Sequence, residues 1–130
     1  WNRKAAKDGK PHRVFCASLA DFADNEVDPD WQRDLVRLIE QTKDLSWLLV
    51  TKRIGNVPRL YRNWMRGGFP DNVRILITIC NRLEAIRDIP KVLALPCKNG
   101  ISYEPALSAV DWNRPIWPDE VGKRGGWLTG

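Results

Sequence analysis

The sequence predicts an α/β fold in which parallel βαβ units build a sheet of about four strands. Four short runs of strand-forming residues recur along the chain, and segments with helical periodicity separate them. The repeat of about 30 residues per unit is typical of right-handed crossovers between parallel strands. Four strands are too few to close an eight-stranded barrel, so the sheet is either open or a TIM-barrel-like partial barrel.

Two of the four predicted strands are largely apolar. The second is apolar throughout residues 47–50, and the third has the same character apart from Thr78 between Ile77 and Ile79. Such runs are typical of parallel strands that are covered on both faces. The predicted strands are residues 12–18 (HRVFCAS), 46–52 (SWLLVTK), 72–80 (NVRILITIC) and 100–104 (GISYE).

The first predicted helix begins after Asp28. Asp28 can cap the free N–H groups of the first turn, Pro29 suits the first helical position, and Asp30 favours the positive end of the helix dipole. Five residues then recur at helical spacing, which predicts one buried stripe. They are Trp31, Leu35, Leu38, Ile39 and Thr42.

Two further helical segments follow. Residues 56–68 have a candidate cap at Asn56 and end in a Gly-Gly pair. In residues 82–96, Pro90 is expected to kink the segment or to begin its second part, because it lacks an N–H group. The residues predicted to face inward in 56–68 are Leu60, Tyr61 and Trp64, and those grouped on one side of 82–96 are Leu83, Ile86 and Leu93.

The pattern divides the chain into a partial (βα) barrel domain over residues 1–112 and an irregular C-terminal tail over residues 113–130. The tail contains two Pro, four Gly and two Trp without a clear period. Such composition is typical of loops and irregular terminal structure.

The length and composition limit the classes of protein to which the chain can belong. A length of 130 residues fits one domain with a buried core. The formal charge of +5 favours acidic partners such as nucleic acid, although a solvated surface with excess Lys and Arg gives the same balance. No apolar run approaches the roughly 20 residues that cross a bilayer. Three cysteines without a CxxC pair favour a reducing cytoplasm, and the single His12 supports neither a His-based metal site nor a Ser-His-Asp triad.

Four motifs occur in the order found in a known family. They are RVFCASLADFAD, WLLVTKRIGNV, RLEAIRDIPKVLALP and ISYEPALSAVDW. On these motifs the chain resembles an uncharacterised phage-borne family whose members look like radical S-adenosylmethionine enzymes. The family's partial (βα) barrel is distantly similar to that of spore photoproduct lyase. The resemblance implies a [4Fe–4S] cluster and S-adenosylmethionine as the cofactors of the family.

The chain departs from the family's pattern at the cluster. Family members carry an N-terminal cysteine motif, upstream of the matching segment, because a cluster needs closely grouped thiolates. Cys16, Cys80 and Cys97 are too dispersed in sequence to replace this motif. We therefore expect neither a cofactor nor a metal in this chain, which resembles only the central portion of such an enzyme.

Ligands of open α/β sheets and barrels bind at the carboxyl ends of the strands. We expect Lys52 and Arg53 to hold a carboxylate or a phosphate, Arg53 with two N–H groups, or to pair with Glu104 or the acidic run from Asp21. Asp21 can equally cap a short turn. The candidates for a substrate or cofactor rim are Ser18, Asp21, Thr51, Lys52, Arg53, Asn81 and Glu104.

Seven Trp residues and the positive charge suggest stacking on nucleic-acid bases. Trp31, Trp47 and Trp64 fall at core-facing positions of predicted elements, so packing explains them. Three others are candidates for a partner surface or for the cover of a sheet edge. They are Trp112, Trp117 and Trp127.

Two functions fit these residues. The first is the central segment or a degenerate relative of a phage-associated radical-SAM-like protein that is not catalytic as this chain. The alternative is a phage-encoded binding protein that engages a host protein or a nucleic-acid complex. Both hypotheses place the chain in the cytoplasm of the host cell.

Overall fold

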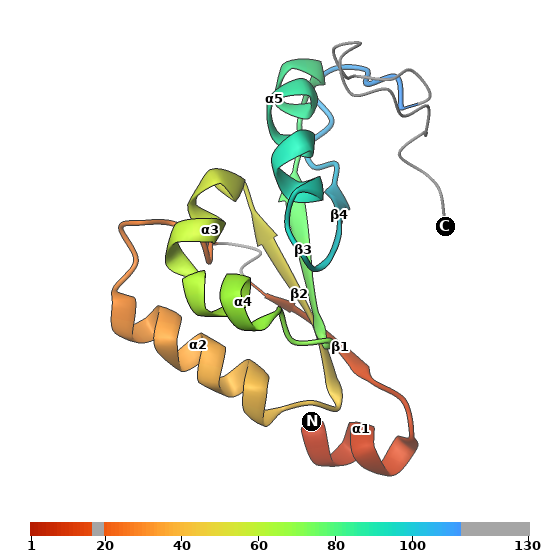
Figure 1. The fold of residues 1–130 in the computed structure, drawn as a ribbon. Coiled ribbons are helices and arrows are strands. Elements are labelled where there is room, and N and C mark those ends of the chain that lie inside the picture. Colours follow the sequence, from red (N-terminus) through yellow and green to blue (C-terminus); the bar gives the residue numbers. More distant parts are fainter. Residues whose placement is uncertain (17–19, 113–130) are drawn as a thin grey trace.

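The computed structural model describes residues 1–16 and 20–112 (Figure 1). The predicted tail and three predicted site residues, Ser18, Trp117 and Trp127, lie outside these ranges. Strands and helices alternate as the sequence predicts, and the pattern did not predict the helix at residues 2–8. The elements are α1 (Asn2–Asp8), β1 (His12–Cys16), α2 (Pro29–Gln41), β2 (Leu45–Thr51), the short 3₁₀ helix η1 (Ile54–Asn56), α3 (Val57–Leu60), α4 (Arg62–Gly67), β3 (Val73–Thr78), α5 (Arg82–Leu93) and β4 (Lys98–Ser102).

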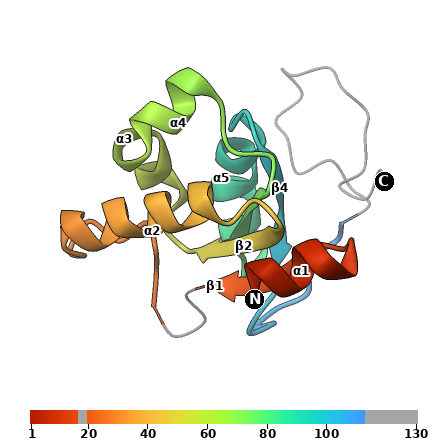
Figure 2. The ribbon, with the colours of Figure 1, turned by 90° about the horizontal axis from the view of Figure 1, so that it is seen from below.

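The four strands form one parallel sheet in the order β1-β2-β3-β4. Each crossover steps one position in the same direction, so right-handed connections place α2 to α5 on one face of the sheet. Figure 2 shows α2, α3 and α4 on one side of β1 and β2. The sheet is open and does not close into a barrel, and the predicted α/β class is confirmed.

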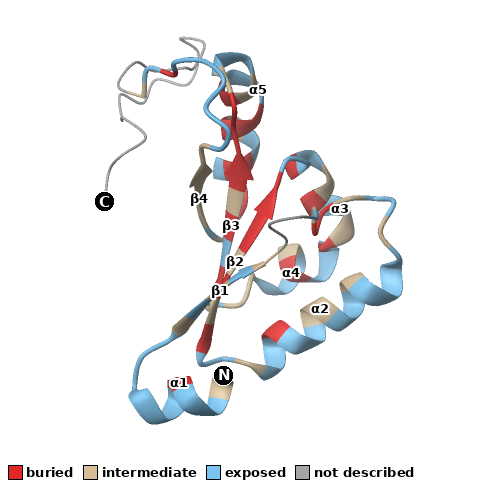
Figure 3. Cartoon of the chain, turned by 180° about the vertical axis from the view of Figure 1, so that it is seen from behind, coloured by how far each residue is buried: buried red, intermediate tan, exposed pale blue. Residues whose placement is uncertain are grey.

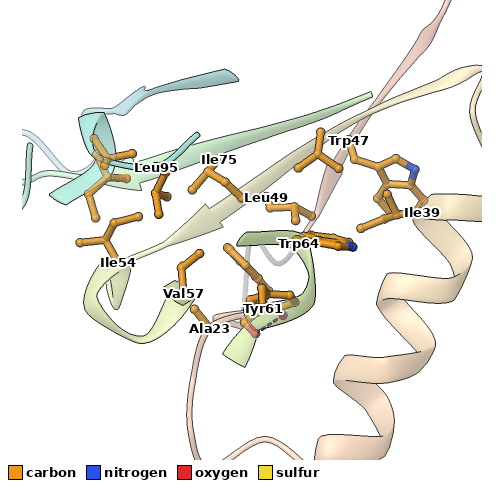
Figure 4. Close-up of a cluster of buried hydrophobic side chains, with 14 of the residues drawn as sticks. Ala23, Ile39, Trp47, Leu49, Ile54, Val57, Tyr61, Trp64, Ile75 and Leu95 are labelled. Atoms are coloured by element: carbon orange, nitrogen blue, oxygen red, sulfur yellow. Dashed lines mark hydrogen bonds between the residues drawn. The ribbon is translucent and has the colours of Figure 1, made fainter. Parts of the chain in front are cut away.

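The core lies between the sheet and these helices (Figure 4). Trp47 pairs with Val73 and Leu49 with Ile75 in the strand register, and all four side chains are buried against the helices. Figure 3 shows the buried residues concentrated on β2 and β3. Each large apolar side chain buried in this way contributes roughly 1.5–3 kcal/mol. This packing fixes where the carboxyl ends of the two central strands lie.

The opposite face of the sheet is only partly covered. Phe15, Leu48 and Arg74 lie side by side there in the strand register. Phe15 is 52% exposed and Leu48 is half-buried, whereas Val50 nearer the carboxyl end is buried. The prediction that the central strands are covered on both faces along their length is therefore wrong. Their apolar runs reflect one fully buried face and one half-buried face.

Helix α2 begins as predicted, because the Asp28 side chain accepts a hydrogen bond of 2.8 Å from the Asp30 N–H. The predicted stripe is only partly correct. Ile39 is buried, but Trp31 is 71% exposed and Leu38 is exposed as well. Figures 1 and 2 show that the first turn of α2 lies away from the strands, so only the later part of the helix meets the core.

The helix predicted over residues 56–68 is divided into short elements. The backbone at Tyr61 (φ −108°, ψ 37°) leaves the helical region and separates α3 from α4. Tyr61 and Trp64 are buried as predicted, and their stacked rings have centroids 5.2 Å apart. Asn56 does not cap with its side chain. Its Nδ2 instead donates to the Ala23 carbonyl at 3.0 Å.

Helix α5 continues through Pro90, so Pro90 does not begin a second helix. The three apolar residues that the sequence groups on one side are exposed: Leu83, Ile86 and Leu93. The inward face of α5 consists instead of Ala85, Asp88, Ile89 and Val92. A buried carboxylate therefore lies among the residues that anchor this helix.

Candidate anion-binding site

Asp21 follows β1 and joins the loops after β1 and β2. Its Oδ1 accepts hydrogen bonds from the Ala23 N–H at 3.0 Å and from Thr51 Oγ1 at 2.6 Å. Its Oδ2 accepts hydrogen bonds from the Lys52 N–H at 2.9 Å and from Arg53 Nη1 at 3.4 Å. Three of the predicted rim residues, Thr51, Lys52 and Arg53, are thus gathered around a fourth.

Two carboxylates orient Arg53. Besides its contact with Asp21, the guanidinium places Nη2 at 3.0 Å from Asp24 Oδ2. The Arg53 N–H donates to Thr51 Oγ1 at 2.8 Å, which fixes the start of the side chain. An Arg side chain has five N–H donors, and this one is 47% exposed. The guanidinium therefore keeps donors for a ligand while its position is set by the fold.

Lys52 reaches toward the end of β3. Its Nζ lies 3.9 Å from the Sγ of buried Cys80, which in turn lies 3.5 Å from the Glu104 carbonyl oxygen. Within the described ranges, Lys52 makes no ion pair, and Glu104 pairs with neither Lys52 nor Arg53. Residues that follow three different strands therefore meet here, and the acidic partners of Arg53 come from the run that starts at Asp21.

Asn81, the rim candidate after β3, caps α5. Its side chain accepts a hydrogen bond of 3.0 Å from the Glu84 N–H, and Glu84 Oε2 accepts one of 2.7 Å from the Cys80 N–H. This reciprocal arrangement satisfies free N–H groups at the start of the helix. It also fixes the direction in which α5 leaves the sheet.

A polar pocket of about 370 Å³ lies between the loop after β2 and helix α5. Lys52 and Arg53 come from the loop, and Arg87 and Lys91 come from the helix. Asn25 belongs to the loop after β1. The lining residues are Asn25, Lys52, Arg53, Ile54, Gly55, Asn56, Arg87, Asp88 and Lys91.

Asp88 holds the two cations of the helix in place. Its side chain is 4% exposed and accepts hydrogen bonds from Arg87 Nε at 2.9 Å and from Lys91 Nζ at 2.8 Å. Burial acts to raise the pKa of Asp88, but the hydrogen bonds from Arg87 and Lys91 outweigh it, so the pKa lies below its usual value. The hydrogen bond to Asp88 raises the pKa of Arg87. The pair of cations on α5 is therefore organised around a permanently charged carboxylate at neutral pH.

The charge of the pocket favours an anion. Four cationic side chains and one carboxylate line it, which leaves three positive charges in excess. Asp21 and Asp24 offset part of this excess through Arg53. Guanidinium groups match the geometry of phosphate and carboxylate oxygens with two parallel hydrogen bonds. Neighbouring cations disfavour a metal ion, and the described ranges contain no group of three or more His, Cys, Asp or Glu side chains that could hold one.

Residues 1–117 match the sequence model of a protein family of unknown function, DUF5131. The chain belongs to the DUF5131 family. The expected membership of an uncharacterised family is thus confirmed, but the match carries no similarity to radical SAM enzymes or to spore photoproduct lyase. No curated protein and no solved structure matches the chain.

The sequence pattern pointed to only two of the four cations that line the pocket of this chain. It selected Lys52 and Arg53, because they follow a strand, but not Arg87, Asp88 and Lys91. The signal was present in the spacing, since Arg87 and Lys91 are four positions apart and lie on one side of a helix with Asp88 between them.

Two further predictions concern surfaces. Trp112 is half-buried, and its ring meets Tyr103 edge-on with centroids 5.3 Å apart. Its assignment to a partner surface stays a prediction. Among the described residues of this DUF5131 protein, none of the helices has the length and apolar character that spanning a bilayer requires.

Proposed function

We propose that this DUF5131 protein is a binding protein for nucleic acid and that its pocket contacts the sugar–phosphate backbone. The observation that carries the proposal is the convergence of Lys52, Arg53, Arg87 and Lys91 on one polar pocket. Phosphate is the anion that rows of Lys and Arg most often bind in nucleic-acid complexes. The net charge of +5 on the whole chain acts in the same direction.

The arrangement of the cations supports phosphate over scattered surface charge. Asp21 and Asp24 hold Arg53, and Asp88 holds Arg87 and Lys91, so three of the four cations have fixed positions before a ligand arrives. Lys52 makes no ion pair within the part of the chain that the structure describes. No carboxylate there competes with an anionic ligand for the positive charge of Lys52. A preorganised cluster of this kind loses less side-chain entropy on binding.

The proposal predicts strongly salt-dependent binding. Each phosphate that Lys or Arg neutralises releases counterions, so the slope of log K against log salt is expected to be roughly −0.7 for each phosphate contacted in a single strand and roughly −0.9 in a duplex. Fluorescence anisotropy with labelled single-stranded and duplex oligonucleotides, from low to physiological salt, measures this slope. Lys91→Gln is expected to make the slope shallower by about one, whereas Lys43→Gln, an exposed lysine outside the pocket, is the matched control.

Two results contradict the proposal. Absence of binding to every oligonucleotide at low salt removes nucleic acid as the ligand. Equal loss of affinity in Lys91→Gln and Lys43→Gln shows that the attraction is a property of the whole surface. Polyglutamate serves as the acidic-protein probe, and tight binding to it alone assigns the pocket to carboxylates of a protein partner.

In the full proposal the protein is phage-encoded and acts in the reducing cytoplasm of a host cell, in keeping with the free Cys16, Cys80 and Cys97.

The sheet order supports a second proposal, which concerns descent. Four parallel strands in sequential order with α2 to α5 on one face are what a segment of a (βα) barrel contains. On this proposal the chain corresponds to the central part of a radical-SAM-like barrel. Cys16, Cys80 and Cys97 do not fit a [4Fe–4S] cluster, because they do not form a group of ligands within the described residues. Anaerobic iron–sulfur reconstitution is therefore expected to give no visible absorbance band, and a stoichiometric cluster on this chain contradicts the expectation.

A further inference from the structure

The pocket is small and opens widely to solvent. A volume of about 370 Å³ lies at the lower end of ligand pockets, which range over about 300–1,000 Å³. Proteins that bind the interior of a single strand instead offer a groove for about 4–16 nucleotides. The four cations of the pocket thus surround room for about one nucleotide, and the opening lets the rest of a strand extend into solvent.

The cations lie on two different elements. Lys52 and Arg53 belong to the loop after β2, while Arg87 and Lys91 belong to α5. A phosphate bound between the two elements receives donors from both. A phosphodiester in the interior of a strand has only two free oxygens, and the chain must leave the pocket on both sides of it. A terminal phosphate has three free oxygens, and the chain leaves on one side only. The terminal phosphate can therefore accept hydrogen bonds from more of the Lys and Arg donors.

The charge of the pocket favours a phosphate of either kind. A phosphodiester carries one negative charge, whereas a phosphate monoester carries about 1.5 to 2 at pH 7. Four cations line the pocket with Asp88, and Asp21 and Asp24 pair with Arg53, so one positive charge remains in excess. Charge therefore draws a phosphate to the pocket, and the larger number of free oxygens is what favours the monoester.

We propose that the pocket between the loop after β2 and helix α5 receives a terminal phosphate monoester of a nucleic-acid strand. This inference rests on the proposed nucleic-acid binding and names the group that the same site recognises. Asp88 is a positioning residue in this role. It touches no ligand but fixes Arg87 and Lys91, through bonds of 2.9 Å to Arg87 Nε and 2.8 Å to Lys91 Nζ.

The experiment uses three oligonucleotides of identical sequence, one with a 5′-phosphate, one with a 3′-phosphate and one with hydroxyl groups at both ends. Competition anisotropy at fixed salt measures their affinities for the full chain. We expect one or both phosphorylated strands to bind at least about tenfold more tightly than the hydroxyl strand. The two phosphorylated strands separate a 5′ from a 3′ terminus as the source of the group.

Variants test whether the preference comes from this pocket. Lys52→Gln and Lys91→Gln are each expected to reduce the ratio between phosphorylated and hydroxyl strands to near one, with Lys43→Gln keeping the ratio of the unmodified chain. Asp88→Asn is expected to reduce the ratio while changing affinity for the hydroxyl strand less. Lys52 makes no ion pair with Asp88, so its variant reports on the site even where variants around Asp88 unfold.

The outcomes are distinguishable. Equal binding of all three strands, with both pocket variants weakening each of them, overturns the terminal-phosphate inference and leaves nucleic-acid binding intact. A preference that survives both Lys52→Gln and Lys91→Gln places recognition of the terminus elsewhere and also overturns the inference. Failure of every strand to bind at low salt overturns the proposed function itself.

Discussion

The core under α2 to α4 and the loops after the strands are stabilised in different ways. In the core, Leu49, Ile75 and their neighbours exclude water through apolar contact, which depends on volume and not on direction. In the loops, Asp21 and Asp88 bring cations and N–H groups together through hydrogen bonds with defined angles. The first region therefore provides most of the stability, and the second determines where charged side chains lie.

The largest expected effect belongs to the core. Ile75 is 0% exposed on the central strand β3, so Ile75→Ala leaves a cavity and is expected to lower the free energy of unfolding by about 3 kcal/mol. Phe15→Ala removes a larger side chain from the half-covered face and is expected to lower it by less than about 1 kcal/mol. Urea unfolding followed by circular dichroism measures both. Equal losses contradict the distinction between the two faces.

An intermediate effect is expected at Asp21. Asp21→Asn keeps the size of the side chain but removes the charge that accepts from Thr51, Lys52 and Arg53, so about 2 kcal/mol of stability should be lost. Affinity for oligonucleotides should fall as well, because Arg53 loses one of its two orienting partners. Asp34→Asn is the control, since Asp34 pairs with Arg37 on the exposed surface of α2. A loss of stability no greater than that of the control contradicts the conclusion that Asp21 joins the two loops.

A smaller effect than that at Asp21 is expected at Asp88, and it depends on pH. The pKa of Asp88 is lowered in the folded protein, so its contribution is present above the unfolded value of about 3.9 and is lost as pH falls through the folded value. Because Arg87 and Lys91 are roughly half exposed, solvent screens the pair, and about 1 kcal/mol is expected. Asp88→Asn should therefore be less stable than the unmodified chain at pH 7, and the difference should shrink as pH falls below about 3.9. A difference that persists unchanged at low pH contradicts the assignment to this carboxylate.

The central strands and one wall of the pocket follow from the sequence. Apolar runs predict β2 and β3, and the strand-end rule selects Asp21, Thr51 and Arg53 because it depends only on chain direction. The other wall does not follow, because it depends on the rotation of α5 about its axis. Three large apolar residues suggest one inward face, but packing against η1 and the sheet selects a face that contains Asp88.

The same competition explains Trp31. Its spacing suits a buried stripe, yet burial also requires that the sheet extend beneath the first turn of the helix, where Trp31 lies. A pattern along one helix contains no information about how far the neighbouring strands reach. The Asp28 cap could be predicted because all the atoms involved lie within a few residues. The cap predicted at Asn56 fails because the Asn56 side chain donates to the Ala23 carbonyl, which is distant in sequence.

Asp21 gives the pocket its own spectroscopic reporters. The N–H groups of Ala23 and Lys52 lie outside every helix and strand, yet both donate to this one carboxylate. An amide proton exchanges with solvent only when its hydrogen bond opens. The exchange rates of these two amides should therefore be set by how often the two loops separate. They report on this separation without any label attached to the protein or its ligand.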